Sequence, residues 1–151
     1  LLAHVEGWQW TPDMIWFNNL QSYGTPNYYV QKLFSNNKGT DLINITLDGK
    51  AVTGQNDLFA SAVKDMNSKE VILKIVNTAG TVQNVSIDLK GAKLDAKGTA
   101  VILKGDGLND ENSFDAPTKI SPKETEFKVK GSQVQYSFPA YSVTVLKIKM
   151  K

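Results

Sequence analysis

Hydrophobic and polar residues follow two different patterns along this chain, and the change falls near residues 37–40. In the first part, Met14-Ile15-Trp16-Phe17 is apolar on both faces, which is typical of a strand buried between two layers. Thr25-Pro26 then has the character of a helix N-cap with proline at the first helical position. Apolar residues recur four positions apart, which predicts a helix from Pro26 to about Ser35. Residues 36–39 are Asn, Asn, Lys and Gly, and we expect left-handed backbone there to end the helix.

Beyond Thr40, apolar and polar residues alternate in short runs that are separated by turn-forming residues. Strands are predicted near residues 43–47, 58–64, 71–76, 85–89, 99–104, 127–130, 134–138 and 142–149. No helical stretch lies between them that would support a parallel sheet. Short strands at this spacing are typical of an antiparallel β-sandwich, so we expect a mainly β fold.

Three details of the sandwich can be predicted from the same pattern. Residues 127–138 read as a β-hairpin that turns at Gly131-Ser132. In the last strand, apolar residues change parity near Val145-Leu146, so either a bulge lies there or both faces are covered. Residues 105–122 are rich in Asp, Asn, Gly and Pro, and should form one long loop pinned by packing or by a neighbouring domain. The side chains expected to face the core are Val134, Tyr136, Phe138, Val143 and Val145.

Composition narrows the possible partners. The chain has 151 residues and a net charge of +2, with 17 basic residues that are all lysine. Nucleic-acid binders depend on arginine for bidentate contacts, so we expect no nucleic-acid partner. The chain has no cysteine, so it can form neither a disulfide nor a thiolate metal site. No apolar run is long enough to span a membrane, so we expect no membrane partner. The chain starts with Leu1 rather than Met, and we expect further chain to precede it.

Candidate catalytic residues are few. His4 is the only histidine, so a multi-histidine metal site is excluded and a Ser-His-Asp triad would depend on this residue alone. Glu6 and Asp13 are the only acids near the aromatic segment, and their spacing does not set two carboxyls across a cleft, as a glycosidase requires. Capping and loop roles fit them better. We therefore expect no catalytic residue and no cofactor within this chain.

Two further groups of residues have both a functional and a structural explanation. The acidic residues of the long loop offer oxygen ligands for Ca²⁺ but lack the spacing of a calcium loop, so we expect a solvated loop and no metal site. These residues are Asp106, Asp110, Glu111 and Asp115. Three tryptophans near the N-terminus could stack on sugar rings, but packing between domains is favoured for them. They are Trp8, Trp10 and Trp16.

Four segments of the chain carry a family resemblance. They are His4-Val-Glu-Gly-Trp-Gln-Trp-Thr-Pro-Asp-Met-Ile-Trp-Phe-Asn-Asn19, residues 22–35, residues 112–122 and residues 136–146. The first two resemble the last barrel segment of glycoside hydrolase family 51 α-L-arabinofuranosidases, and the other two are similar to segments that close the sandwich in those enzymes. The resemblance implies a β-sandwich of jelly-roll type that follows a (β/α)8 barrel. Residues 1–39 would be the terminal strand-loop-helix unit of a missing catalytic barrel, and residues 40–151 the C-terminal sandwich domain.

The resemblance also implies a function for a longer parent enzyme. Such an enzyme removes terminal α-L-arabinofuranosyl groups from arabinan or arabinoxylan by a retaining mechanism, as part of hemicellulose degradation. Both of its catalytic glutamates would precede Leu1, so this chain alone is expected to be inactive. The sandwich would pack on the barrel, and Asn18, Asn19 and Gln21 would lie at its catalytic face as hydrogen-bond partners for sugar hydroxyls. A secreted or periplasmic location is favoured.

Two other classes of protein remain open, namely a stand-alone carbohydrate-binding module and a structural or adhesion sandwich. A binding module normally exposes a row of aromatic residues, whereas the aromatic pairs beyond residue 40 fall on inward positions and include no tryptophan. Without the barrel, the strand at Met14 to Phe17 would lack flanking strands. We therefore expect residues 1–37 to lie on the sandwich or to mediate self-association.

Overall fold

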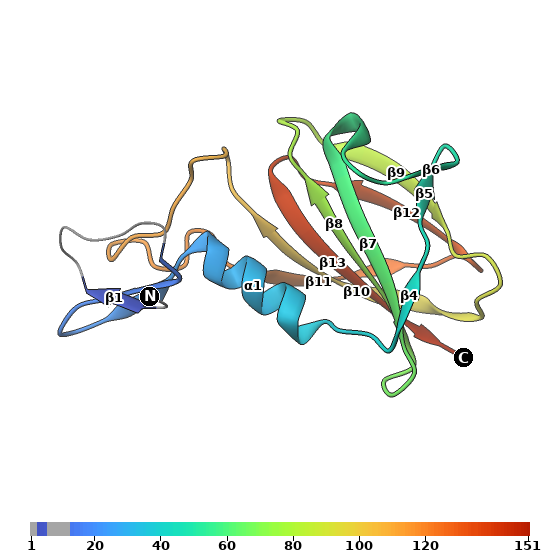
Figure 1. Cartoon of the computed structure of the whole chain (residues 1–151), viewed down its shortest axis with the longest axis horizontal. Coiled ribbons are helices and arrows are strands. Elements are labelled where there is room, and N and C mark those ends of the chain that lie inside the picture. The colour runs from blue at the N-terminus through green and yellow to red at the C-terminus, as the bar shows by residue number, and fades with distance from the viewer. Residues whose placement is uncertain (1–2, 6–12) are drawn as a thin grey trace.

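The computed structural model describes residues 3–5 and 13–151, and for residues 3–5 it describes the backbone only. The described chain is mainly β, with one α-helix and one 3-10 turn, Gln55–Asp57. Figure 1 shows the sandwich at one end of the molecule, a small three-stranded unit at the other, and α1 between them. The elements are β1 (Ala3–Val5), β2 (Ile15–Phe17), β3 (Ser22–Gly24), α1 (Pro26–Asn36), β4 (Asp41–Ile43), β5 (Thr46–Leu47), β6 (Lys50–Ala51), β7 (Leu58–Asp65), β8 (Glu70–Asn77), β9 (Gln83–Asp88), β10 (Leu94–Lys104), β11 (Lys123–Lys128), β12 (Gln133–Phe138) and β13 (Ser142–Met150).

The sandwich is built from antiparallel sheets, which confirms the expected fold class. Its large sheet has six strands in the order β11-β10-β13-β8-β7-β4, and every neighbouring pair is antiparallel. β12 and β9 form a second, two-stranded sheet, and β5 and β6 form a short hairpin. The jelly-roll connectivity stays a prediction.

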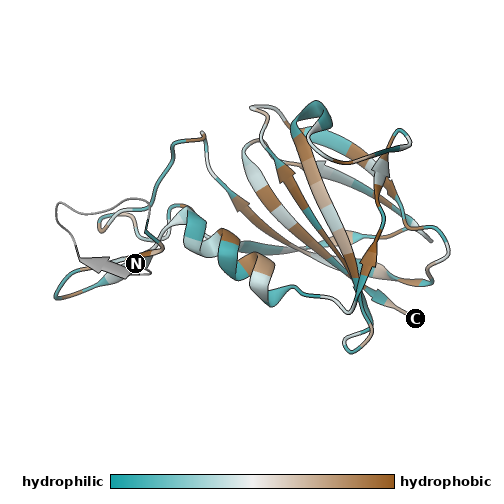
Figure 2. Ribbon diagram, viewed as in Figure 1, coloured by the Kyte–Doolittle hydropathy of each residue, from teal (hydrophilic) through white to brown (hydrophobic). Residues whose placement is uncertain are grey.

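The main core lies between the large sheet and the smaller one. Alternate residues of β8 point into it, and hydrophobic and hydrophilic residues alternate along the strands of the large sheet in Figure 2. β12 contributes Val134 and Phe138, which are buried, and Tyr136, which is partly buried against the same core. The inward positions predicted for these three residues are therefore confirmed. The other buried members are Leu58, Ala62, Val71, Leu73, Ile75, Leu94, Ala100, Val129, Leu146 and Ile148.

A second apolar cluster, which we call the helix-side cluster, covers the opposite face of the large sheet. Leu33 from α1 packs there against Ile72, Leu103 and Val145 from the sheet and Ile120 from the long loop. Because both faces of the sheet are covered, β13 can bury both of its faces. This arrangement explains the change of parity that the sequence shows.

The register of β13 decides between the two explanations for its parity change and corrects one expectation about its side chains. Its pairing with β8 runs without interruption from Ser142 to Lys149, so no bulge lies near Val145 on that side. The irregularity belongs to β10, between Leu94 and Gly98. Val143 and Val145 face the helix layer rather than the interior of the sandwich, because the even-numbered residues of β13 occupy that interior.

Helix α1 begins as the sequence predicts, but it ends with a side-chain cap rather than with the expected left-handed backbone. The Thr25 hydroxyl accepts a hydrogen bond from the backbone N–H of Tyr28 at 3.3 Å, and Pro26 is the first helical residue. The C-cap residue Asn37 has φ −116°, which is not left-handed. Its side-chain amide instead donates to the carbonyl of Leu33 at 2.8 Å. A side-chain cap therefore satisfies the last turn.

The predicted hairpin at residues 127–138 is wrong. β11 pairs with β10 and β12 pairs with β9, so the two segments belong to different sheets. Between them only a single bridge joins Lys130 and Gln133 around the turn at Gly131, which has φ +64°. The chain crosses the sandwich here, and the rings of Phe127 and Tyr136 meet edge to face at 5.5 Å.

Two other strand predictions need correction. The expected first strand near residues 43–47 is divided into β4 and β5, which pair with different partners. The expectation that Met14 to Phe17 lacks flanking strands is also wrong, because β2 pairs with β1 in parallel and with β3 antiparallel. No helix in the described part of the chain combines the length and the apolar character needed to cross a membrane.

Candidate functional site

The loop between β2 and β3 brings the three predicted sugar-binding residues together in one turn. The Asn18 side-chain carbonyl accepts hydrogen bonds from the backbone N–H groups of Leu20 and Gln21, both at 2.9 Å. Asn18 N–H also donates to the carbonyl of Gln21 at 2.9 Å. Asn18 thus shapes the turn, whereas the side chains of Asn19 and Gln21 are exposed. Leu20, at the tip, is 95% exposed.

The two acids considered for catalysis do not form a described pair. Glu6 lies outside the described residues, as do Trp8, Trp10 and the side chain of His4. Asp13 is buried, and its backbone carbonyl accepts a hydrogen bond from the Thr25 hydroxyl at 2.8 Å. Because Thr25 also caps α1, this contact ties the start of the helix to the segment that precedes β2. The position of Asp13 fits a structural role.

The long loop, residues 105–122, is pinned to the N-terminal unit. The buried side-chain amide of Asn112 donates to the carbonyl of Gly24 at 2.8 Å and to that of Ile120 at 2.9 Å. Its carbonyl oxygen accepts from the N–H of Ile120 at 2.7 Å. Phe114 meets Tyr23 edge to face at 5.0 Å. The packing predicted for this loop is confirmed, and its partner is the strand that leads into α1.

Among the four acidic residues of this loop, Asp110 has a side chain that binds the backbone of the loop itself. The Asp110 carboxylate accepts a hydrogen bond from the N–H of Asp106 at 2.6 Å and forms an ion pair with Lys119 at 3.0 Å. The hydrogen bond from Asp106, followed by that from Lys119, lowers the pKa of Asp110 below its ordinary value. Across residues 13–151 no group of three or more acidic or histidine side chains is placed to bind a metal ion.

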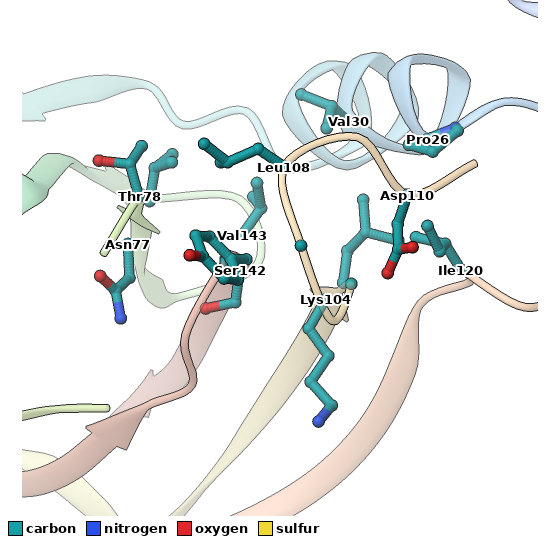
Figure 3. A pocket seen from close by; sticks show the side chains of 15 residues that line it. Pro26, Val30, Asn77, Thr78, Lys104, Leu108, Asp110, Ile120, Ser142 and Val143 are labelled. Atoms are coloured by element: carbon teal, nitrogen blue, oxygen red, sulfur yellow. The ribbon is translucent and has the colours of Figure 1, made fainter. Parts of the chain in front are cut away.

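A cavity of about 190 Å³ lies where α1, the long loop and the ends of β8 and β13 meet. Figure 3 shows Val30, Leu108, Ile120 and Val143 around it, while Lys104 extends away from the helix. Asp110 is the only acidic side chain in the lining. The cavity therefore lacks the two carboxyls that glycoside hydrolysis requires, and its apolar walls suit packing better than catalysis.

Several large apolar side chains remain exposed on the side of the large sheet that carries α1. Leu42 pairs with Val63, which packs in the helix-side cluster, and Phe59 pairs with Val76, which lines the cavity. Both therefore point towards the helix side. We call Phe34, Leu42, Phe59 and Leu108 the helix-side patch, and their exposed fractions range from 36% to 88%. Large apolar side chains exposed on one side of a domain are candidates for contact with another protein or domain.

The fold defines a β-sandwich domain with an attached helix that packs on one face of the large sheet. A family model described as the alpha-L-arabinofuranosidase C-terminal domain matches residues 1–142. The chain therefore belongs to that domain family.

Relatives align with the chain only through their C-terminal part. Alpha-L-arabinofuranosidase 1 of Arabidopsis thaliana is 30% identical over 148 residues, which cover 94% of this chain and 21% of the relative. Probable alpha-L-arabinofuranosidase A of Aspergillus oryzae is also 30% identical, and the alignment covers 97% of this chain and 22% of that relative. The arabinose-bound structure of MgGH51 α-L-arabinofuranosidase is 28% identical with a TM-score of 0.82, covering 95% of this chain and 22% of that one. The chain thus spans about a fifth of the length of the curated relatives that it matches.

Proposed function

We propose that this chain is the non-catalytic C-terminal β-sandwich domain of an α-L-arabinofuranosidase. The observation that carries the proposal is the family match over residues 1–142, together with alignment to only a fifth of each relative. The parent enzyme would remove terminal α-L-arabinofuranosyl residues from arabinan or arabinoxylan by a retaining mechanism. Its catalytic glutamates would lie in the part of the polypeptide that this chain does not contain.

The domain would pack on the catalytic barrel through its helix side. Residues 1–39 would be the terminal β-α segment of the catalytic barrel, and residues 40–151 would form the C-terminal sandwich domain. α1 shares a buried cluster with the large sheet, so it would act as a rigid connection between the two bodies. The helix-side patch lies on the same side and would be covered by the barrel. With the barrel present, Asn19 and Gln21 would approach sugar hydroxyls, and Asn18 would hold their turn in shape.

Charge substitutions in the helix-side patch test this arrangement. In the longer polypeptide, Leu42→Asp with Phe59→Asp should lower the melting temperature and promote separate unfolding of the two domains, because both charges would be buried at the contact. In the isolated chain the same pair should have a smaller effect, since Leu42 is 88% and Phe59 46% exposed there. Val82→Asp, at an apolar residue that is 54% exposed outside the patch, is the control. Equal effects of the pair in both polypeptides would rule out docking through this surface.

Self-association through residues 1–37 is a separate part of the proposal. Phe17 and Leu20 are exposed in the N-terminal unit and would be left bare without a barrel. A chain that begins at Thr40 is a poor comparison, because removing α1 would uncover the second cluster. Sedimentation of the whole chain should instead be compared with that of Phe17→Asp/Leu20→Asp. A monomer in both cases would contradict self-association.

A further inference from the structure

A second groove, of about 390 Å³, lies between the C-terminal half of α1 and the entry to β11. Tyr29, Lys32 and Asn36 line it from one face of the helix, because residues three or four apart lie on the same side. Leu33, which is buried, also lines it, and Ser121 with Pro122 forms the opposite wall. The groove is distinct from the cavity described above.

Both walls of this groove are held in place. Leu33 packs in the helix-side cluster with Ile120, the residue that immediately precedes Ser121. Asn112 binds both the N–H and the carbonyl of Ile120, at 2.7 and 2.9 Å, so the second wall is fixed by a buried side chain. On the helix side, the Asn37 amide is fixed by its bond to the Leu33 carbonyl. A ligand would therefore meet a largely preformed surface.

The polar groups of the groove retain free hydrogen-bonding capacity. Within the described part of the chain, no hydrogen bond engages the Asn36 amide or the Tyr29 hydroxyl. Asn37 uses one N–H of its amide and keeps its carbonyl oxygen, and Ser121 donates to Thr118 but can still accept. Lys32 supplies the one charge, and its ammonium lies 5.8 Å from the centre of the Tyr28 ring.

We propose that this groove is a binding site for a neutral saccharide. A sugar ring presents an apolar C–H face together with a rim of hydroxyl groups, and the groove offers a tyrosine ring and a proline ring beside amides and a hydroxyl. Tyr29 and Pro122 lie against the C–H face, and the Asn36, Asn37 and Ser121 side chains bind hydroxyls. An anionic ligand would require more than the single cation here. The groove would hold a polysaccharide chain beside the enzyme without taking part in its cleavage.

The proposal is tested by titrating the isolated chain with α-1,5-linked arabinotriose and following backbone amide shifts by NMR. The choice of this probe rests on the proposed function, whereas the groove itself does not. We expect saturable shifts in residues 29–37 and 121–122. Asn36→Ala should weaken binding about tenfold, the usual effect of losing a hydrogen-bonded amide in a small site. Gln31→Ala removes an exposed amide from the opposite face of α1 and should leave binding unchanged.

Tyr29→Ala should weaken binding by a similar factor, but Tyr29 also packs in the helix-side cluster. Asn36 is exposed, so its variant keeps the test independent of folding. A folded chain that shows no saturable shifts, or whose binding survives both Asn36→Ala and Tyr29→Ala, would overturn the proposal. Tighter binding of a polygalacturonate oligomer than of arabinotriose would overturn the proposal that the ligand is a neutral saccharide. None of these results bears on whether the longer polypeptide hydrolyses arabinofuranosides, so failure of this site and failure of the proposed function are distinguishable.

Discussion

Asn112 and Gly24 are joined by a hydrogen bond of 2.8 Å between the side-chain amide of one and the carbonyl of the other, although 88 residues separate them in sequence. The bond links the long loop to the strand that enters α1. Together with the helix-side cluster, this bond fixes the N-terminal unit to the sandwich. The proposed boundary at residues 39 and 40 would therefore mark an origin in two domains rather than a flexible joint.

Replacement of Asn112 should destabilise the chain strongly. Asn112→Ala removes partners from the carbonyls of Gly24 and Ile120 and from the N–H of Ile120. Leaving buried polar groups unpaired costs about 1–3 kcal/mol, and we expect a loss of that size in urea denaturation. The exposed neighbour variant Asn109→Ala should change the free energy of unfolding by less than about 0.5 kcal/mol. Equal effects of the two substitutions would contradict a pinning role for Asn112.

Thr144 offers the opposite case, a substitution that should stabilise. Its hydroxyl is fully buried in β13 and has no hydrogen-bond partner in the described structure. Thr144→Val replaces this hydroxyl with a methyl group of similar size, so we expect a gain of about 1 kcal/mol in thermal or urea unfolding. Ser142→Ala in the same strand is the matched comparison. Its hydroxyl donates to the carbonyl of Pro139 at 2.7 Å, so that variant should lose stability.

Gly98 occupies the irregular part of β10, where a side chain would not fit. A Cβ atom there would collide with the Phe127 ring and come within 2.9 Å of the Lys147 carbonyl. Gly98→Ala should therefore cost about 1–3 kcal/mol, as expected for overpacking against backbone and a partly buried ring. Gly107→Ala is a suitable control because a Cβ atom there meets open space. If both variants melt at the same temperature, the close packing at Gly98 is not present in solution.

Asp110 should make the loop sensitive to acid. Its pKa is lowered in the folded chain, chiefly by the hydrogen bond from the Asp106 N–H and then by Lys119. A depressed folded pKa adds stability above the ordinary pKa of 3.8, and that stability is lost as the pH falls through the folded pKa. Asp110→Asn should consequently be less stable than the native chain at neutral pH, and the difference should shrink below about pH 4. Glu111→Gln, an exposed neighbour, is the control, and a difference that persists at low pH would contradict the account.

The elements that the sequence predicts well are those set by local patterns. The Thr25-Pro26 start of α1 depends on residues within one turn, and the alternation in β8 and β13 follows from which side chains must be buried. For the change of parity in β13, the sequence allows two explanations, a bulge or burial of both faces. The structure selects cover on both faces because α1 and Ile120 pack on the outer face of the sheet.

The elements that the sequence does not predict depend on distant partners. The turn at Gly131 has the chemistry of a hairpin turn, yet the same turn can carry a chain from one sheet to the other. Asn112 is one of several polar residues in the long loop, and nothing local distinguishes it as the buried one. The partners of β2 are likewise set by three-residue strands too short to leave a periodic signal.

The candidate site divides in the same way. The family resemblance led to Asn18, Asn19 and Gln21, but only coordinates reveal that the Asn18 carbonyl is occupied by two backbone N–H groups. The groove beside α1 joins helix residues to Ser121 and Pro122, some 90 positions later in the chain, so spacing alone could not reveal it. The approach of these segments depends on tertiary packing rather than on local propensity.

The most direct test of the central claim is the hydrolysis of 4-nitrophenyl α-L-arabinofuranoside, measured in parallel for this chain alone and for the longer polypeptide that contains it. We predict release of nitrophenol by the longer polypeptide and none above the buffer rate by the isolated chain, because a two-carboxylate centre would lie outside residues 1–151. Turnover by the isolated chain that disappears in the Glu6→Gln variant would contradict the claim that this domain is non-catalytic.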